Sequence, residues 1–251
     1  MGCFWSNDSL FGATLGVIRT RVGYSGGTTK NPHYRSLGDH TEVIELDYDP
    51  KSVTFEDLLD MFWANHEYGL TTKLKRQQCC TDLGNDFSDM LIYQFQYQSM
   101  ILYHDEEQRE AAEASHKEMT SRFGQLRTEI APASTFYPAE ESEGEESYKE
   151  MTARFGQLRT EIAPASSTFY PAEDYHQKYR LQGHKDLCRS LGLDSGKLQT
   201  SHLAARLNGY LVGVGGKAQF EAELPQLGLN EKQAEYVRTE IERNEGGGLA
   251  C

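Results

Sequence analysis

The tetrapeptide Gly2-Cys3-Phe4-Trp5 opens the chain and begins a pattern that is typical of a helix. Apolar residues follow at the spacing of one buried helical face, at Phe4, Trp5, Leu10, Phe11 and Leu15. A cysteine in the first turn of a helix lies at the positive end of the peptide dipoles, which favours thiolate over thiol. Cys3 is therefore a candidate nucleophile beside an apolar wall that suits a methyl group. A small buried core thiol is the alternative interpretation.

Beyond this helix, the chain alternates apolar and polar side chains as strands do, over residues 17–22 and again over residues 41–49. The first strand ends in a glycine-rich loop at residues 23–27, where glycine permits backbone conformations closed to other residues. Thr54, with Asp57 three residues later, is a typical N-cap for the amphipathic helix that follows. The order strand, strand, helix predicts an α+β fold.

The composition argues against several classes of protein. The 251 residues are 38% hydrophobic, so the chain can bury a sizeable core, and the net charge is −13. Nucleic acid and anionic membrane are therefore not expected as partners, because phosphate binding needs a basic surface. No apolar run approaches the roughly 18 residues of a membrane span. The sequence predicts a cytoplasmic monomer.

The cysteines, at positions 3, 79, 80, 188 and 251, form neither a metal-ligand spacing nor a disulfide framework. Reactive or inert thiols in a reducing compartment fit this pattern better. Cys188 ends an amphipathic segment at residues 184–188 and is expected to be packed and inert. Cys251 follows the glycines at 246–248, which give the last thiol conformational reach.

The first residues also match the M-G-x-x-x-[ST] pattern of N-myristoylation, at Met1, Gly2 and Ser6. This alternative predicts a membrane-anchored protein. Residues 1–30 contain only three basic side chains, so no polybasic patch supplies the second signal that stable anchoring requires. The missing basic patch argues against the alternative.

A segment of the chain is repeated: residues 117–133 recur as residues 149–165 with a single change, and an acidic stretch lies at residues 140–150. A near-identical pair differs from a solenoid, which needs at least three stacked units. The pair indicates a copied segment, of which only one copy occupies the native position in the sheet. Only the second copy continues into Asp174-Tyr175-His176-Gln177, so we expect the second to be native and the first to loop out.

Five motifs follow one another along the chain. They are Gly2-Cys3-Phe4-Trp5, Val22-Gly23-Tyr24-Ser25-Gly26-Gly27, Asn31-Pro32-His33-Tyr34, His40-Thr41-Glu42-Val43 and Phe169-Tyr170-Pro171-Ala172-Glu173-Asp174-Tyr175-His176-Gln177. With these motifs the chain resembles peptide methionine sulfoxide reductase A over roughly residues 1–77 and 97–216. The resemblance implies a single α+β domain, a two-layer sandwich with a mixed central sheet flanked by helices around a ferredoxin-like core.

The resemblance further implies reduction of the S epimer of methionine sulfoxide, free or in oxidised proteins, with no cofactor and no metal. Cys3 would attack the sulfoxide sulfur, and Glu42 would donate a proton to the sulfoxide oxygen. Tyr34 and Tyr97 would hydrogen-bond that oxygen. The remaining residues would bind substrate, with Phe4 and Trp5 holding the methyl group and His176, Asp174 and Tyr210 around the rim. For Asp174 an ordinary surface position is an equal alternative.

The sulfenic acid left on Cys3 would be resolved by a second thiol to a disulfide. Leu211 follows Asn208-Gly209-Tyr210 at the position where the family usually has its resolving cysteine. Cys251 is expected to replace that cysteine, which makes the chain resemble a divergent subgroup of the family. Thioredoxin, or dithiothreitol in vitro, would then return the disulfide to thiols.

Two departures from the family pattern support a different interpretation of the function. The family has a strand before its glycine-cysteine motif, which we expect this chain to lack, and residues 78–96 form an insert that contains Cys79 and Cys80. These changes predict, as the alternative, an inactive family member that acts as an interaction protein.

The predicted organisation is a catalytic domain at residues 1–216 and a helical extension with a flexible cysteine tail at residues 217–251. Within the catalytic domain, residues 78–96 are the insert and residues 117–148 are the duplicated segment with its acidic linker. In the extension, Asn230 is expected to cap a helix that reaches about Asn244.

Overall fold

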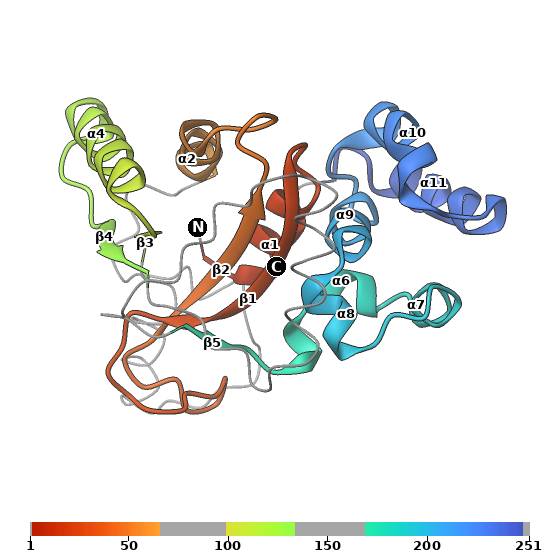
Figure 1. Ribbon diagram of the computed structural model, residues 1–251, viewed down its shortest axis with the longest axis horizontal. Coiled ribbons are helices and arrows are strands. Elements are labelled where there is room, and N and C mark those ends of the chain that lie inside the picture. The colour runs from red at the N-terminus through yellow and green to blue at the C-terminus, as the bar shows by residue number, and fades with distance from the viewer. Residues whose placement is uncertain (1, 66–98, 134–168, 248–251) are drawn as a thin grey trace. The chain divides into compact units, whose positions relative to one another are not determined.

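The computed structural model describes residues 2–65, 99–133 and 169–247 (Figure 1). The chain divides into two compact units. The α/β unit consists of residues 1–3, 23–43 and 53–172, and the helical unit consists of residues 4–22, 44–52 and 173–251.

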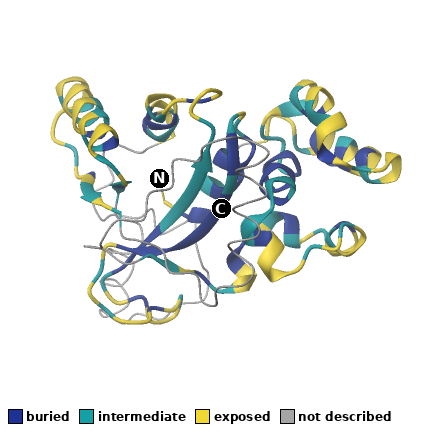
Figure 2. Cartoon of the chain, viewed as in Figure 1, coloured by how far each residue is buried: buried dark blue, intermediate teal, exposed yellow. Residues whose placement is uncertain are grey.

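Both strands predicted from alternation are present, although the first continues through part of the predicted glycine-rich loop. β1 spans Val17–Ser25 and β2 spans Thr41–Tyr48, and a short third strand, β5, spans Tyr170–Pro171. Their order is β2-β1-β5, and β1 pairs with β5 in antiparallel register. Gly23 is required at this pairing because a Cβ there would lie 2.4 Å from the ring of Phe169. β1 is the central strand and is buried along almost its whole length (Figure 2).

The α/β unit also contains two further strands, with a helix between them in the sequence, and one more helix. β3 spans Met100–Tyr103, α4 spans Glu106–Phe123, β4 spans Glu129–Pro132 and α2 spans Phe55–Ala64. β3 and β4 pair in parallel. α2 begins with the predicted capping box, in which Thr54 Oγ1 accepts from the backbone N–H of Asp57 at 3.1 Å. Leu59 and Trp63 of α2 pack with Ala112 of α4 in one small core.

The first repeat copy does not loop out, which corrects the prediction. Residues 117–133 supply the C-terminal part of α4 and all of β4. Asp105 caps α4 through the backbone N–H of Gln108 at 2.8 Å, and Gly124, with φ of 84°, ends the helix. The helix therefore starts before the copied segment and continues into it. The second copy, the acidic stretch at 140–150 and the insert at 78–96 lie outside the described residues.

Two helices of the helical unit cross closely: α1, Phe4–Gly12, and α9, His202–Tyr210. A Cβ on Gly12 would lie 2.6 Å from the carbonyl oxygen of Ala205, and a Cβ on Gly209 would lie 2.4 Å from the Cβ of Ala13. The missing side chains of these two glycines therefore permit the contact that fixes α1. The helix predicted to start at Phe4 is confirmed, although it ends earlier than predicted.

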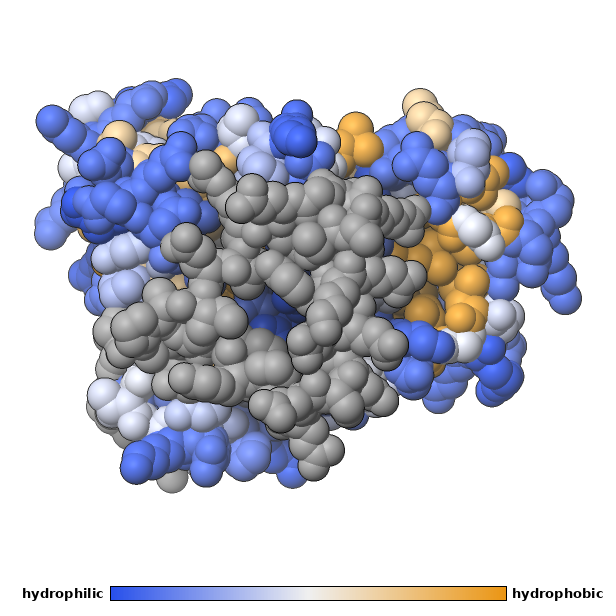
Figure 3. All heavy atoms as spheres, viewed as in Figure 1, coloured by the Kyte–Doolittle hydropathy of each residue, from blue (hydrophilic) through white to orange (hydrophobic). Residues whose placement is uncertain are grey.

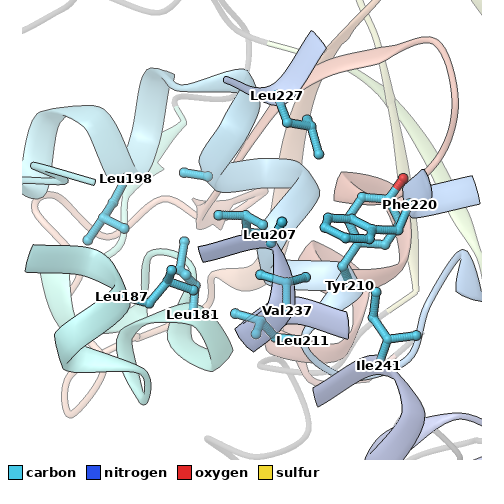
Figure 4. Close-up of a cluster of buried hydrophobic side chains, with 12 residues drawn as sticks. Leu181, Leu187, Leu198, Leu207, Tyr210, Leu211, Phe220, Leu227, Val237 and Ile241 are labelled. Atoms are coloured by element: carbon cyan, nitrogen blue, oxygen red, sulfur yellow. The ribbon is translucent and has the colours of Figure 1, made fainter. Parts of the chain in front are cut away.

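The C-terminal part of the helical unit is built from short consecutive helices. They are the 3-10 turn η1 (Asp174–His176), α6 (Tyr179–Gln182), α7 (Lys185–Ser190), α8 (Ser195–Thr200), α10 (Gly216–Leu227) and α11 (Glu231–Asn244). Their apolar faces form one core, which Figure 4 shows around Leu207, Tyr210 and Val237. Asn230 caps α11, as predicted. Phe220 of α10 belongs to the same core, so the helices after the predicted boundary at residue 216 pack on those before it.

The chain belongs to the mixed α and β class, because it combines helices with one antiparallel and one parallel strand pair. Apolar surface is seen on the helical unit (orange in Figure 3), and several leucines packed against its core are only partly buried: Leu191, Leu193, Leu203, Leu224 and Leu229. Across the described ranges, no helix is both long enough and apolar enough to cross a bilayer.

Candidate active site

Cys3 directly precedes the first residue of α1. Only 8% of the residue is exposed. Gly2 before it has φ of 73°, in the left-handed region that favours glycine. The N–H groups at the start of a helix carry a partial positive charge, so this position favours a thiolate. The predicted location of Cys3 at the start of a helix is confirmed.

Phe4 and Trp5, in the first turn of α1, contact the ring of His176. The ring centroids of Phe4 and His176 are 5.1 Å apart, and those of Trp5 and His176 are 5.5 Å apart. The Nε1–H of Trp5 donates a hydrogen bond to Nδ1 of His176 at 3.1 Å. The structure thus brings together three residues that the sequence assigned to the substrate.

Tyr179 is a fourth ring of this cluster, which the sequence motifs did not predict. Its ring stacks on that of Trp5, with centroids 3.8 Å apart and planes 7° apart. Because Tyr179 is 41% exposed, it forms an outer wall of the cluster. Its place three residues after His176 on a short helical segment was the available signal. We call Phe4, Trp5, His176 and Tyr179 the aromatic cluster.

His176 is held in its neutral form. Burial lowers the pKa of His176 to about 4, and the Glu173 carboxylate, 4.0 Å from Nε2, opposes this shift only partly. Since Nδ1 accepts the hydrogen bond from Trp5, the network assigns the proton of the neutral ring to Nε2. At neutral pH the aromatic cluster therefore presents an uncharged wall, which suits an apolar methyl group.

Tyr210 does not lie at the rim of a site, which corrects the prediction. Its ring is fully buried in the helical core, edge to face with Phe220 at a centroid distance of 5.2 Å. The hydroxyl donates to Glu223 and accepts from Gln219 at 3.1 Å. Burial and the bond to Glu223 raise the pKa of Tyr210 to about 12. The motif around Tyr210 did not reveal this position, because the ring is covered by side chains of α10, the helix that follows α9.

Asp174 is exposed at the start of η1, and its backbone carbonyl accepts from the Gln182 amide at 2.7 Å. This position supports an ordinary surface role for Asp174. Cys188 packs against the helical core, and its thiol donates to the carbonyl of Leu181 at 3.3 Å. Burial raises the pKa of the Cys188 thiol. A protonated, partly buried thiol is a poor nucleophile, in line with the expectation for Cys188.

Glu42 and Tyr34 both belong to the α/β unit. Glu42 is the second residue of β2 and is only 8% exposed. Tyr34 is half-buried in a turn that is closed by backbone hydrogen bonds between His33 and Ser36. A buried carboxyl group and a tyrosine hydroxyl are the groups that proton donation to a sulfoxide oxygen requires.

The loop before Glu42 is fixed by Asp39 and His40. Asp39 accepts hydrogen bonds from the backbone N–H groups and hydroxyls of Thr28 and Thr29, at 2.7–3.1 Å. These bonds hold the pKa of Asp39 well below its usual range. The His40 ring joins the N–H of Gly27, at 3.2 Å, to the carbonyl of Thr29, at 2.7 Å. The start of β2 is thereby attached to the glycine-rich loop.

Tyr97, Cys79, Cys80 and Cys251 lie outside the described residues, and their roles stay predictions. Within the described parts, no group of three or more His, Cys, Asp and Glu side chains has the arrangement of a metal site.

Comparison with known families identifies the chain. Residues 1–153 match the sequence model described as peptide methionine sulfoxide reductase. The chain belongs to the peptide methionine sulfoxide reductase family. Residues 192–242 also match the helical domain of selenoprotein methionine sulfoxide reductase A. The resemblance that the five motifs indicated is confirmed, and with it the oxidoreductase class.

The chain is similar to the following named proteins. The peptide methionine sulfoxide reductase of Drosophila melanogaster is 48% identical over an alignment of 253 residues, which covers 100% of this chain and 82% of that protein. Peptide methionine sulfoxide reductase A5 of Arabidopsis thaliana is 31% identical over 84% of this chain and 65% of its own length. Among solved structures, methionine sulfoxide reductase A of Corynebacterium diphtheriae has 26% identity and a TM-score of 0.45, and covers 73% of this chain and 72% of its own.

Proposed function

We propose that this member of the peptide methionine sulfoxide reductase family is a peptide-methionine (S)-S-oxide reductase that acts on methionine sulfoxide, free or in oxidised proteins. The observation that carries the proposal is the place of Cys3 directly before α1. Phe4 and Trp5, the next two residues, belong to the aromatic cluster. A thiolate followed by an apolar wall suits a substrate whose reacting sulfur carries a methyl group.

In the first step, the Cys3 thiolate attacks the sulfoxide sulfur and Glu42 donates a proton to the oxygen. The oxygen ends on Cys3 as a sulfenic acid, and the methionine thioether leaves. The substrate thus gains the two electrons that the cysteine sulfur loses. Tyr34 and Tyr97 hydrogen-bond the oxygen as its charge develops.

In the second step, the Cys251 thiol attacks the sulfenic acid, so that a Cys3 to Cys251 disulfide forms and water leaves. The dithiol of thioredoxin then reduces this disulfide by thiol–disulfide exchange and is itself oxidised to a disulfide. The burial and raised pKa of Cys188 support Cys251 over Cys188 as the resolving thiol.

The purified chain tests this function with the separate S and R epimers of a peptide methionine sulfoxide and dithiothreitol as reductant. We expect reduction of the S epimer alone, and its complete loss in Cys3→Ser. Cys188→Ser is the matched control and should retain the rate. Activity that survives in Cys3→Ser, or equal reduction of both epimers, would reject the proposal.

We also infer that the sheet β2-β1-β5 belongs to a two-layer sandwich with a ferredoxin-like core. The support is the antiparallel pairing of β1 with β5 in a sheet of order β2-β1-β5, a kind of sheet that commonly carries its helices on one face. An experimental structure that places helices on both faces of this sheet would reject the two-layer arrangement.

A further inference from the structure

Three consecutive residues of the helical unit, His176, Gln177 and Lys178, bind α1 and β1. His176 accepts the hydrogen bond from Trp5 in the first turn of α1. Gln177 forms two bonds with the backbone of Val22 in β1, since its Oε1 accepts from the N–H at 3.0 Å and its Nε2 donates to the carbonyl at 2.8 Å. Lys178 binds both elements at once.

Lys178 and Asp8 of α1 form a buried ion pair. The Nζ of Lys178 lies 3.0 Å from Oδ1 of Asp8, and the backbone N–H of Lys178 donates to Oδ2 at 3.2 Å. Both side chains are almost completely buried, with 1% and 0% exposed. Lys178 therefore contacts the Asp8 carboxylate with both its side chain and its backbone. Its φ is 51°, in the left-handed region that residues with side chains seldom adopt.

Further donors surround this pair. Nζ of Lys178 also donates to the carbonyl of Thr20 in β1 at 2.5 Å. The Thr20 hydroxyl donates to Asp8 Oδ1 at 2.5 Å, and the Asn208 amide of α9 donates to Oδ2 at 3.3 Å. Burial lowers the pKa of Lys178, and the attraction of Asp8 opposes that shift. The carboxylate therefore fixes α1 to β1, α9 and the segment after η1.

Stability alone is a weak reason for such a pair. Removing two charges from water is costly, and replacing a buried ion pair with apolar side chains of similar volume is often neutral or stabilising. What the pair adds is directional contact, because its hydrogen bonds fix one orientation of the helix. Trp5 and Asp8 lie three residues apart and therefore on the same side of α1, where His176 and Lys178 bind them.

We propose that Lys178 is a positioning residue for sulfoxide reduction: through Asp8 it fixes the first turns of α1 and so the direction in which that helix presents Cys3. The inference rests on the proposed role of Cys3 as nucleophile. It extends the function to a residue that contacts neither substrate nor the reacting sulfur.

The test is a single-turnover measurement on the full chain, which follows formation of the thioether from stoichiometric peptide sulfoxide without reductant. The variant is the double substitution Asp8→Leu with Lys178→Met, which replaces the ion pair by an apolar pair. We expect it to fold with a lower melting temperature than the wild type, because the Thr20 hydroxyl, the Asn208 amide and the backbone N–H of Lys178 lose their acceptor on Asp8. Its rate at saturating sulfoxide should fall about tenfold or more, with the half-saturating concentration nearly unchanged, because a small misplacement of the reacting atom slows chemistry more than binding.

A matched control is Glu242→Leu with Lys217→Met, since Lys217 and Glu242 form an exposed ion pair in the same unit, with 48% and 56% exposed. This variant should keep the wild-type rate. A double variant at Asp8 and Lys178 that folds and keeps the full rate would overturn the inference. So would one in which only the half-saturating concentration changes.

If the double variant fails to fold, Thr20→Val decides the question. Valine keeps the volume of Thr20 and the carbonyl that binds Lys178, and it removes only the hydroxyl that donates to Asp8. A slower rate at saturating sulfoxide with unchanged half-saturation supports the inference, and a wild-type rate overturns it. The wild-type chain is measured first: if it reduces no sulfoxide, the proposed function fails, whereas unaffected variants of an active wild type reject only the role of Lys178.

Discussion

The indole N–H of Trp5 donates a hydrogen bond to Nδ1 of His176 at 3.1 Å, and this contact joins the first turn of α1 to a segment more than 170 residues later in the chain. The bond has a direction, because an imidazole nitrogen that accepts from Trp5 holds no proton of its own. Protonation of His176 would place two donors against each other. The neutral ring and the position of Trp5 therefore depend on one another.

This contact predicts a loss of stability in acid. The pKa of His176 is about 4 in the folded protein and near 6.5 otherwise, so the unfolded chain binds more protons between these values. The contribution of His176 is fully present above about pH 6.5 and is lost as the pH falls toward 4, by at most about 3 kcal/mol. Urea unfolding at several pH values measures it. His176→Asn, which keeps an acceptor for Trp5 but does not titrate, should show a flatter pH dependence.

Exposed His104 supplies the control for that measurement. His104→Asn should leave the pH dependence of unfolding as it is in the wild type. If His176→Asn and the wild type lose equal stability between pH 6.5 and pH 4, the burial of a neutral His176 is not what links stability to pH.

The stack of Tyr179 on Trp5 predicts a role in catalytic efficiency. Tyr179→Ala removes a ring that lies parallel to the indole, a contact worth about 1 kcal/mol, so kcat/KM for peptide sulfoxide should fall several-fold up to about tenfold. Tyr179→Phe keeps the stack and should retain most of the activity. Tyr236→Ala is the control, because Tyr236 is equally exposed, at 41%, but lies on α11. Equal losses in both alanine variants would argue against a specific wall at Tyr179.

The close crossing of α1 and α9 predicts a strong effect of one methyl group. In Gly209→Ala the new Cβ would lie 2.4 Å from the Cβ of Ala13 and 2.5 Å from the carbonyl oxygen of Ser9, so the helices must separate. We expect a loss of about 2–3 kcal/mol in the free energy of unfolding by urea. Gly196→Ala in exposed α8 should be neutral or slightly stabilising, because alanine is the better helix former. A wild-type stability of Gly209→Ala would mean that the crossing is looser than described.

Local signals in the sequence identified the parts of the fold that depend on neighbouring residues. Thr54 with Asp57, and Asn230 at the start of α11, cap their helices as predicted, because a cap needs only the residues within one turn. Alternation likewise located β1 and β2. Cys3 was placed at a helix start because the apolar spacing after it is a local signal.

Signals failed where partners lie far apart in the sequence. The repeat copies have almost the same composition, so propensity could not decide between them, and the preceding segment that starts α4 determines the conformation of the first copy. For Tyr210 the reason differs: its partners lie on α10, only about ten residues later, but no motif in the sequence indicates that this helix folds back over the ring. The stack of Tyr179 on Trp5 joins residues that only the folded chain brings together.

The buried position of Glu42 predicts a specific defect in Glu42→Gln. The amide keeps the shape of the side chain but cannot donate the proton that the departing oxygen needs, so the single-turnover rate should fall about 100-fold or more at neutral pH. Alkylation of Cys3 by iodoacetamide should continue at nearly the wild-type rate. Asp39→Asn is a useful comparison, since it weakens the loop before Glu42 and should affect stability as well as rate. A parallel loss of alkylation in Glu42→Gln would indicate a structural role for Glu42.

The last prediction concerns the resolving thiol. Cys188 is partly buried, with a raised pKa and a hydrogen bond to Leu181, so it is a poor partner for a sulfenic acid on Cys3. Cys251 follows three glycines, and one turnover should therefore leave a Cys3 to Cys251 disulfide. Cys251→Ser should complete a single turnover but lose recycling by thioredoxin, while dithiothreitol, which reaches the sulfenic acid directly, still supports it. Cys188→Ser should recycle normally.

Peptide mapping after one equivalent of sulfoxide identifies the bridge, and a disulfide from Cys3 to Cys188, Cys79 or Cys80 would show that the assignment of Cys251 is wrong.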